Sequence, residues 1–281
     1  MRFFKRRPIV PVIRLSGPIG MATPLRPGIS IAAVADGLER AFSMSKLPTV
    51  AVVVNSPGGS PVQSNLIFKR LRHLANEKNK RVYVFCEDVA ASGGYYLAVA
   101  GDEIYADPSS IVGSIGVIAA TFGLDKAIAR IGVERRVYTA GESKLVLDPF
   151  KPEKPEDVER IKSIQKDVHD IFIGVVKDRR AERLKGLDSE LFSGAFWSAP
   201  KALELGLIDG VSDVRSKMRE LHGPEVQLKV VPFATGGFLS RVLRLPRLMH
   251  TPAVNGGLPL ALADDLVSAI EARALWSRYG F

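Results

Sequence analysis

Continuous apolar runs alternate with helical repeats along the first half of the chain. The runs in VPVIRLSGPI, LPTVAVVVNSPGGS and RVYVFCEDVA each end in a loop, as expected for strands that are buried on both faces. Between them, GISIAAVADGLERAFSM and PVQSNLIFKRLRHLANEK place apolar residues at helical spacing. Strands that alternate with helices in this way predict βαβ units, and therefore an α/β fold with a mainly parallel sheet flanked by helices.

The same pattern continues with shorter elements. DEIYAD, SIVGSIGVIAA and ERRVYTA are expected strands, GLDKAIARIG is an expected helix closed by Gly132, and a long helix is expected over roughly 155–183. We expect one domain over residues 1–222. Residues 223–281 form an extension with a strand in VQLKVVPFA, a basic and apolar segment, and a terminal amphipathic helix.

The charge of the chain limits its partners only weakly. The 281 residues carry 39 basic and 30 acidic side chains, which gives a net charge of +9. No dense Lys/Arg run is interleaved with aromatic residues, so we expect no nucleic-acid partner. The basic and apolar segment Phe238–Met249 fits either an anionic membrane surface or a neighbouring subunit, and both readings stay open.

The N-terminal segment MRFFKRRPIVPVIRLSG is basic and then apolar, but prolines and Arg14 interrupt it, so a first strand is expected instead of a signal peptide. No apolar run reaches the ~20 residues that a membrane-spanning helix needs. We therefore expect a cytoplasmic protein whose contact with a membrane, if any, is peripheral.

The metal-ligating and redox residues are few. Cys86 is the single cysteine, which excludes an intrachain disulfide and a CxxC site, and we expect it to be a buried core thiol. The four histidines, His73, His169, His222 and His250, are scattered without metal-ligand spacing. Neither a metal nor a cofactor is expected.

Two glycine-rich loops follow expected strands, NSPGGS at 55–60 and ASGG at 91–94. Ligand sites in parallel α/β sheets collect at the carboxyl ends of strands. Ser92 is either a nucleophile or only the N-cap of the next helix. If Ser92 is the nucleophile, the N–H of Gly93 and that of Gly58 or Gly59 would form an oxyanion hole. The glycine pair at 93–94 would then keep side chains away from the backbone of a substrate. Ser114 is a second candidate nucleophile.

A serine nucleophile needs a base. His73 and His169 lie on expected helices, away from the strand ends, which leaves Lys144 in AGESKLVLDPF. Its apolar neighbours predict burial, which favours the neutral amine that a base requires. The rival reading is a crotonase-type enzyme acting on acyl-CoA, with Glu87 or Asp88 as its base.

The motifs VVVNSPGGS, ASGGYYLAVAGDEIYADPSSIVGSIGV, ESKLVLDPF and ALELGLIDG resemble the SppA-type signal peptide peptidases, also called protease IV. These are serine peptidases with a Ser–Lys dyad on a ClpP/crotonase-like fold. The resemblance covers about residues 8–215 and implies that Ser92 is the nucleophile, Lys144 the general base, and Ser114 a partner beside the lysine.

The resemblance also implies an assembly and a substrate class. The chain holds one copy of the fold, and single-copy members form homo-oligomeric rings in which the serine of one subunit meets the lysine of its neighbour. A single subunit is then expected to hold Ser92 far from Lys144. The implied substrates are extended apolar peptides, such as signal-peptide remnants or fragments of membrane proteins. Ser143 stands where the family commonly has an aromatic residue. A non-catalytic, ring-forming scaffold at a membrane is the third reading.

Overall fold

The computed structural model describes residues 7–20, 28–141, 143–233, 270 and 273–280. Its strands are β1 (Ile9–Ser16), β2 (Thr49–Ser56), β3 (Arg81–Ala91), β4 (Glu103–Ala106), β5 (Ile111–Gly113), β6 (Phe196–Ser198), β7 (Gly210–Val211) and β8 (Gln227–Val230). They lie in the order β6-β5-β3-β2-β1-β8, with β4 beside β3 and β7 beside β4. Every pairing between them is parallel except that of β5 with β6, which confirms the predicted α/β class.

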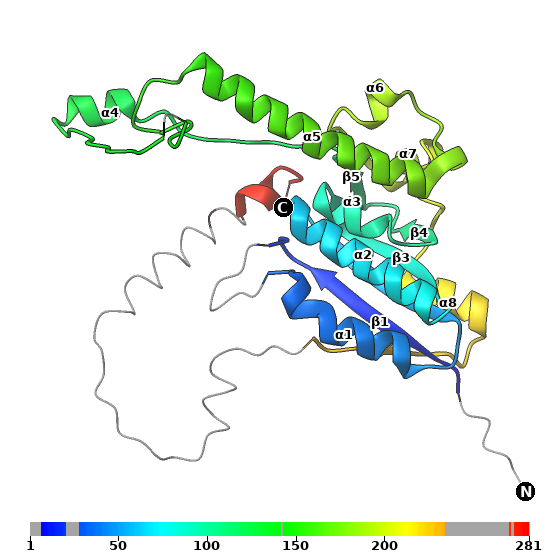
Figure 1. Cartoon of the computed structure of the whole chain (residues 1–281). Helices are drawn as coiled ribbons and strands as arrows, with labels where there is room; N and C mark the ends of the chain where they lie inside the picture. The colour runs from blue at the N-terminus through cyan, green and yellow to red at the C-terminus, as the bar shows by residue number, and fades with distance from the viewer. Residues whose placement is uncertain (1–6, 21–27, 142, 234–269, 271–272, 281) are drawn as a thin grey trace, which may run out of the picture.

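Helices flank this sheet (Figure 1). They are α1 (Ile31–Met44), α2 (Pro61–Glu77), α3 (Gly93–Ala98), α4 (Asp125–Arg130), α5 (Pro155–Arg180), α6 (Asp188–Leu191), α7 (Ala199–Glu204) and α8 (Val214–His222). The two long N-terminal helices begin where the sequence supplies a cap. The Ser30 hydroxyl accepts from the Ala33 N–H at 3.3 Å, and the Ser60 hydroxyl accepts from the Gln63 N–H at 3.4 Å.

The apolar run of β2 is continuous because both faces of the strand are covered. Val50, Val52 and Val54 face the larger core, where residues of α1, α2 and α5 pack on the sheet. Val53 faces a second, smaller core that includes Met218 of α8. Successive side chains of a strand point to opposite faces, so one apolar run supplies both cores.

Strand β3 divides between two neighbours, and this division positions the loop after it. Its first part, Tyr83–Cys86, pairs with β4, whereas Val89–Ala91 pairs with β5. Its register with β2 also shifts between Val54 and Ser56. The end of β3 is therefore redirected toward β5, and the chain enters α3 beside the loop that follows β2.

A long segment between β5 and α5 leaves the body of the molecule. Residues 117–154, which we call the arm, carry α4 beyond the other helices (Figure 1). The expected helix closed by Gly132 is present as α4. The strand expected in ERRVYTA is absent from the described residues, because no other strand lies beside that part of the arm to pair with it.

Apolar side chains of the arm are exposed to solvent. Phe122 is 80% exposed and Tyr138 91%, and Ile118, Ile131 and Val133 are also mainly exposed. Isolated exposed apolar residues are ordinary, whereas these five lie along one projecting segment.

The strand expected in VQLKVVPFA is present as β8, which pairs in parallel with β1 and so extends the sheet beyond residue 222. Farther on, Tyr279 is buried against Val89 and Ala91 of β3. The segment Phe238–Met249 lies outside the described residues.

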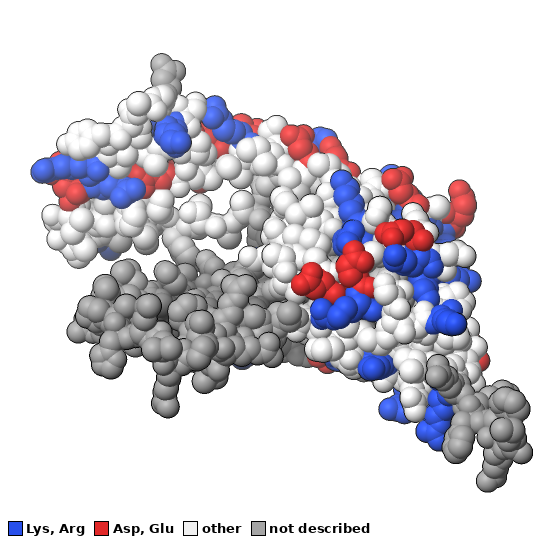
Figure 2. Space-filling view, turned by 60° about the horizontal axis from the view of Figure 1, so that its bottom comes forward, with Lys and Arg blue, Asp and Glu red and all other residues white. Residues whose placement is uncertain are grey.

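On the face that Figure 2 shows, basic side chains lie on both the arm and the body, with acidic side chains among them. Cys86 is buried, and burial raises the pKa of its thiol to about 12, as expected for a core thiol. In the part of the chain that the structure describes, no helix has the length and apolar content to cross a membrane.

Candidate active site

Ser92 lies between β3 and α3, at the carboxyl edge of the sheet. Its backbone has φ 52° and ψ −123°, a conformation that residues other than glycine rarely adopt. The Ser92 N–H donates to the Gly113 carbonyl of β5 at 2.8 Å and helps to hold this turn. Ser92 is the N-cap residue of α3, yet its side chain makes no capping hydrogen bond. Capping therefore does not account for this serine, and strain at a partly exposed hydroxyl is typical of a functional position.

The loop after β2 lies directly against Ser92. A Cβ atom added at Gly58 would come within 2.8 Å of the Ser92 Cβ and 2.9 Å of the Gly93 nitrogen. The Gly58 φ of +103° also favours glycine. The approach that the two glycine-rich loops predicted is thus present.

The two glycines of this loop differ as oxyanion-hole donors. The Gly58 N–H donates to the Ser56 hydroxyl at 3.2 Å, so it is already engaged. Gly59 bridges to Ile19, and the hydrogen bonds of that bridge use the Gly58 carbonyl and the Ser60 N–H. Among the described residues the Gly59 N–H has no hydrogen-bond acceptor. The N–H of Gly93, the first residue of α3, lacks an acceptor within the helix. Gly93 and Gly59 are therefore the pair of N–H groups best suited to an oxyanion.

The glycine pair at 93–94 has a packing role that the sequence did not indicate. A Cβ atom at Gly94 would lie 2.3 Å from the Ser56 carbonyl oxygen, and one at Gly93 would lie 2.6 Å from the Ser64 hydroxyl. The two glycines thus let α3 pack against β2 and α2. Packing inside the protein therefore already requires glycine at both positions, whether or not a substrate is bound.

Two cavities open beside Ser92. The first, which we call the apolar pocket, has a volume of about 190 Å³ and is lined by Ser92, Gly93 and apolar side chains of α2, α3 and α5, among them Leu66, Tyr96 and Phe172. The Tyr96 hydroxyl donates to the Asn65 side chain at 3.2 Å at its wall. A pocket of this size and composition accommodates one apolar side chain.

The second cavity, which we call the serine cavity, has a volume of about 500 Å³ and brings Ser92 and Ser114 together with His169. Ser114 also has a positive φ, 52°, and its N–H donates to the Ala195 carbonyl at 2.6 Å. Tyr279 and Arg278 form part of the wall, and the Tyr279 ring lies 5.1 Å from that of Phe196. The C-terminal segment therefore contributes to the surroundings of Ser92.

The placement of His169 corrects the sequence analysis, which set this residue aside. Its Nε2 atom lies 3.0 Å from the Ile115 carbonyl oxygen, beside Ser114. The missed signal was the spacing along α5, because positions 169, 172 and 176 share one helical face and Phe172 and Val176 are buried in the core.

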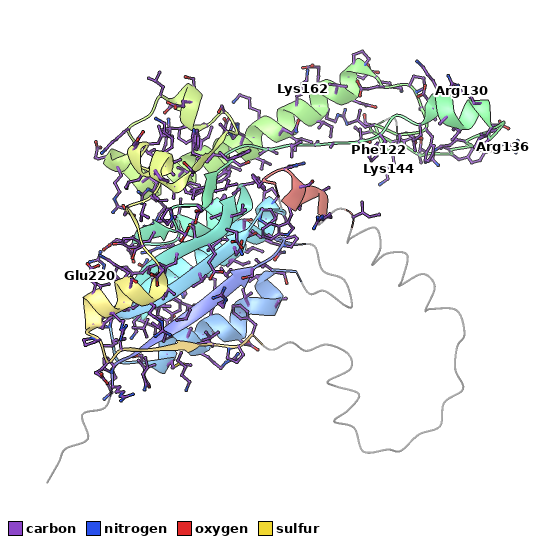
Figure 3. The ribbon with its side chains drawn as sticks, turned by 180° about the vertical axis from the view of Figure 1, so that it is seen from behind. Phe122, Arg130, Arg136, Lys144, Lys162 and Glu220 are labelled. Atoms are coloured by element: carbon purple, nitrogen blue, oxygen red, sulfur yellow. The ribbon has the colours of Figure 1, made fainter. Side chains whose placement is uncertain are left out.

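Lys144 lies on the arm and lines neither cavity (Figure 3). It is exposed, so the expected burial among apolar residues does not occur within a single chain. The reason is that the arm has no core of its own to enclose the side chain. Ser143, beside it, accepts a hydrogen bond from Arg160 of α5 at 3.2 Å. The structure thus groups Ser92, Ser114 and the glycines, and it leaves Lys144 apart from them.

The residues of the crotonase reading lie elsewhere. Glu87 and Asp88 line a separate cavity on the other side of β3 from α3, together with Asp107. Glu87 forms an ion pair with Arg14, and Asp88 accepts from the Asn55 side-chain amide at 2.6 Å. Neither carboxylate faces the two cavities beside Ser92.

Comparison with known proteins identifies relatives of this chain. The sequence model of peptidase family S49 matches residues 74–229. The Arabidopsis thaliana protein named "Serine protease SPPA, chloroplastic" is 30% identical over 71% of this chain and 29% of its own length. A putative protease of Synechocystis is 34% identical over 58% of this chain and 58% of its own length.

A Brucella abortus protein named "Na(+)/H(+) antiporter NhaA" is 52% identical over 96% of this chain. The chain covers 37% of that protein, so the name describes a chain more than twice as long. More generally, this chain spans less than two thirds of the length of the relatives compared here. The family match, in contrast, falls on the segment that contains Ser92, Ser114 and Lys144.

Proposed function

Because the chain belongs to peptidase family S49, we propose that it is a serine peptidase whose nucleophile is Ser92. The observation that carries the proposal is the turn at Ser92. Its hydroxyl does not cap α3, its backbone has a positive φ, and the N–H groups of Gly93 and Gly59 are available beside it. A serine next to two unengaged backbone donors is the arrangement that acyl transfer requires.

The general base in this proposal is Lys144 of a neighbouring subunit. Support comes from the arm, which carries Lys144 away from the Ser92 of its own chain and exposes Phe122, Ile131 and Tyr138. Packing of the arm on another copy would bury these side chains and place Lys144 in a drier environment, which favours the neutral amine. In this proposal the contact repeats from subunit to subunit through a rotation that closes, which gives a ring.

The proposed reaction proceeds in two steps. The Ser92 Oγ attacks the peptide carbonyl carbon while the neutral Lys144 amine takes its proton, and the oxyanion is held by the N–H groups of Gly93 and Gly59. Lys144 then gives that proton to the leaving amine, and an acyl ester remains on Ser92. Lys144 next takes a proton from a water molecule, whose oxygen attacks the ester carbon. The bond between that carbon and the Ser92 Oγ breaks, the proton passes to Oγ, and the peptide leaves with a new carboxyl group. In this proposal Ser114, which lines the same cavity as Ser92, orients the incoming lysine.

The apolar pocket supports a proposal for the substrate class. Its volume of about 190 Å³ and its lining from Leu66, Tyr96 and Phe172 suit an apolar side chain next to the scissile bond. We therefore propose extended apolar peptides as substrates, including remnants of signal peptides and fragments of membrane proteins.

The direct test replaces the two proposed catalytic residues and assays cleavage of a fluorogenic apolar peptide. Ser92→Ala and Lys144→Ala should each lower kcat by about 10³-fold or more. The matched controls are Ser109→Ala and Lys151→Ala, which remove the same groups from exposed positions and should leave kcat unchanged. Full activity of either catalytic variant would show that the dyad is assigned wrongly.

A further inference from the structure

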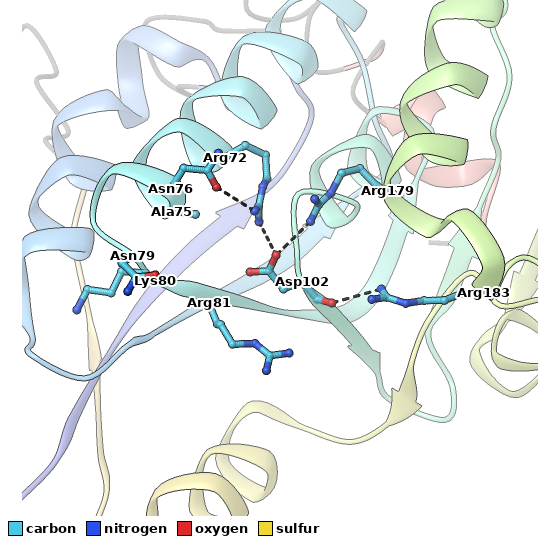
Figure 4. Close-up of a pocket in the computed structure, with 9 residues that line it drawn as sticks. All are labelled: Arg72, Ala75, Asn76, Asn79, Lys80, Arg81, Asp102, Arg179 and Arg183. Atoms are coloured by element: carbon cyan, nitrogen blue, oxygen red, sulfur yellow. Dashed lines mark hydrogen bonds and ion pairs between the residues drawn. The ribbon is translucent and has the colours of Figure 1, made fainter.

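A basic cleft lies at the amino-terminal edge of the sheet, opposite the edge that carries Ser92 (Figure 4). Arg81 begins β3 and Asp102 directly precedes β4, whereas Ser92 follows the far end of β3. The cleft has a volume of about 530 Å³. Its lining contains five basic side chains and one carboxylate, and consists of Arg72, Ala75, Asn76, Asn79, Lys80, Arg81, Asp102, Arg179 and Arg183.

Two of the arginines are held in fixed positions. Arg72 of α2 donates to the Ala100 carbonyl and to the Asp102 carboxylate, both at 2.9 Å. Arg179 of α5 donates to the carbonyls of Val99 and Gly101 at 3.0 and 2.8 Å, and to Asp102 at 3.3 Å. These bonds cap the end of α3, and they pre-organise two guanidinium groups side by side.

The same two guanidinium groups keep donors in reserve. A guanidinium has about five N–H donors in a planar fork. Arg72 also contacts the Asn76 side chain at 3.5 Å, so Arg72 and Arg179 each use three donors within the described residues. Capping of α3 therefore explains their positions and leaves part of each fork unused.

The acids beside the cleft neutralise only part of its positive charge. Arg81 pairs with Glu103 at 2.7 Å, and the Lys80 amine donates to the carbonyls of Ser45 and Leu47. One carboxylate oxygen of Asp102 forms ion pairs with both Arg72 and Arg179, and the other accepts from the Val82 N–H at 2.8 Å. The Arg183 side chain is 3.6 Å from an Asp209 carboxylate that already pairs with the buried Arg180. Desolvation and the neighbouring Arg72 charge lower the pKa of Arg179, as expected where like charges are crowded.

We propose that the basic cleft is a binding site for a phosphate-bearing anion. Its volume falls within the range of small-molecule sites, and adjacent guanidinium forks match the geometry of phosphate oxygens. Arg81 and Arg183, whose side chains are 59% and 48% exposed, complete the charged rim, and the Asn76 and Asn79 amides add neutral polar groups. The phosphate belongs either to a soluble compound or to the headgroup of an anionic lipid.

The test measures binding to two probes, one for each source. Inorganic tripolyphosphate is titrated by calorimetry, and vesicles of phosphatidylglycerol and phosphatidylcholine are used in co-sedimentation. The cleft variant is the double substitution Arg81→Ala with Arg183→Ala. The control is Arg136→Ala with Arg215→Ala, which removes two exposed arginines outside the cleft.

The full-length protein and the control should bind at least one probe, and the cleft variant should bind it about tenfold more weakly or worse. Binding of tripolyphosphate alone assigns a soluble ligand, and binding of vesicles alone assigns a lipid headgroup. Absence of binding to both probes by the unmodified protein would overturn the proposal. Equal affinities of the cleft variant and the control would overturn it too. Thermal unfolding of each variant verifies that it is folded, and none of these readouts depends on peptidase activity.

Discussion

The contact between Gly58 and Ser92 can be tested by the addition of one methyl group. In Gly58→Ala the new Cβ would lie 2.8 Å from the Ser92 Cβ, 2.9 Å from the Gly93 nitrogen and 3.0 Å from the Ala91 carbonyl oxygen. Carbon atoms in ordinary contact are about 3.5–4.0 Å apart, so the two loops must separate by roughly 0.5–1 Å. The atoms that move are the nucleophile and a proposed oxyanion donor.

The size of the effect follows from those atoms. Loss of one oxyanion-hole donor costs about 2.7–4 kcal/mol of transition-state stabilisation, or roughly 10²–10³ in kcat. The positive φ of Gly58 adds a separate cost of about 1–3 kcal/mol to the free energy of folding. Activity should therefore fall by about 10²-fold or more, while the folded state is weakened by a few kcal/mol.

The matched control is Gly17→Ala. Gly17 has φ +106°, close to the +103° of Gly58, but a Cβ there would meet no atom within 4 Å. Both variants carry the same backbone cost, and only one carries the clash at Ser92. The assay is kcat on the fluorogenic peptide, normalised to the folded fraction from circular dichroism. If Gly58→Ala keeps the kcat of Gly17→Ala, the contact with Ser92 does not matter for catalysis.

Three other substitutions test packing and charge. Burial lowers the pKa of His222 from 6.5, so the unfolded chain binds the proton more readily and stability falls as the pH drops below that value. His222→Gln retains a hydrogen-bond partner for Thr49 but cannot titrate. The free energy of unfolding of this variant should therefore differ less between about pH 5 and about pH 7.5 than that of the unmodified protein. Arg180→Ala leaves Asp209 without its buried partner and should cost about 3–5 kcal/mol in urea unfolding. Phe172→Ala should enlarge the apolar pocket and raise kcat/KM for a bulkier apolar residue relative to a smaller one.

The elements with the strongest apolar pattern were predictable from the sequence. Strands β1, β2 and β3 and helices α1, α2 and α5 are present as expected. The apolar residues that define their sequence patterns are the ones buried in the two cores. The prediction failed in the arm. The residues of ERRVYTA have strand propensity, but a strand needs a neighbour, and the described part of the arm provides none.

In the candidate site, too, features set by a short stretch of sequence were predictable, and features set by the packing of distant segments were not. Ser92 and the glycines could be proposed from the sequence because each lies at a strand end, where a short motif determines the backbone. The position of His169 beside Ser114 was missed because it depends on the contact of α5 with Ile115, which no local motif encodes. The expected burial of Lys144 was wrong for the single chain because apolar neighbours in sequence do not enclose a side chain unless other elements pack on it.

The central claim is that Ser92 of one subunit works with Lys144 of another, and mixing of two inactive variants tests it most directly. Ser92→Ala and Lys144→Ala subunits are unfolded together, refolded as a mixture and assayed on the fluorogenic peptide. Random assembly of equal amounts restores an intact pair at about one quarter of the interfaces, so about a quarter of the native activity should return. A mixture that assembles but stays as inactive as its components would contradict a dyad shared between subunits.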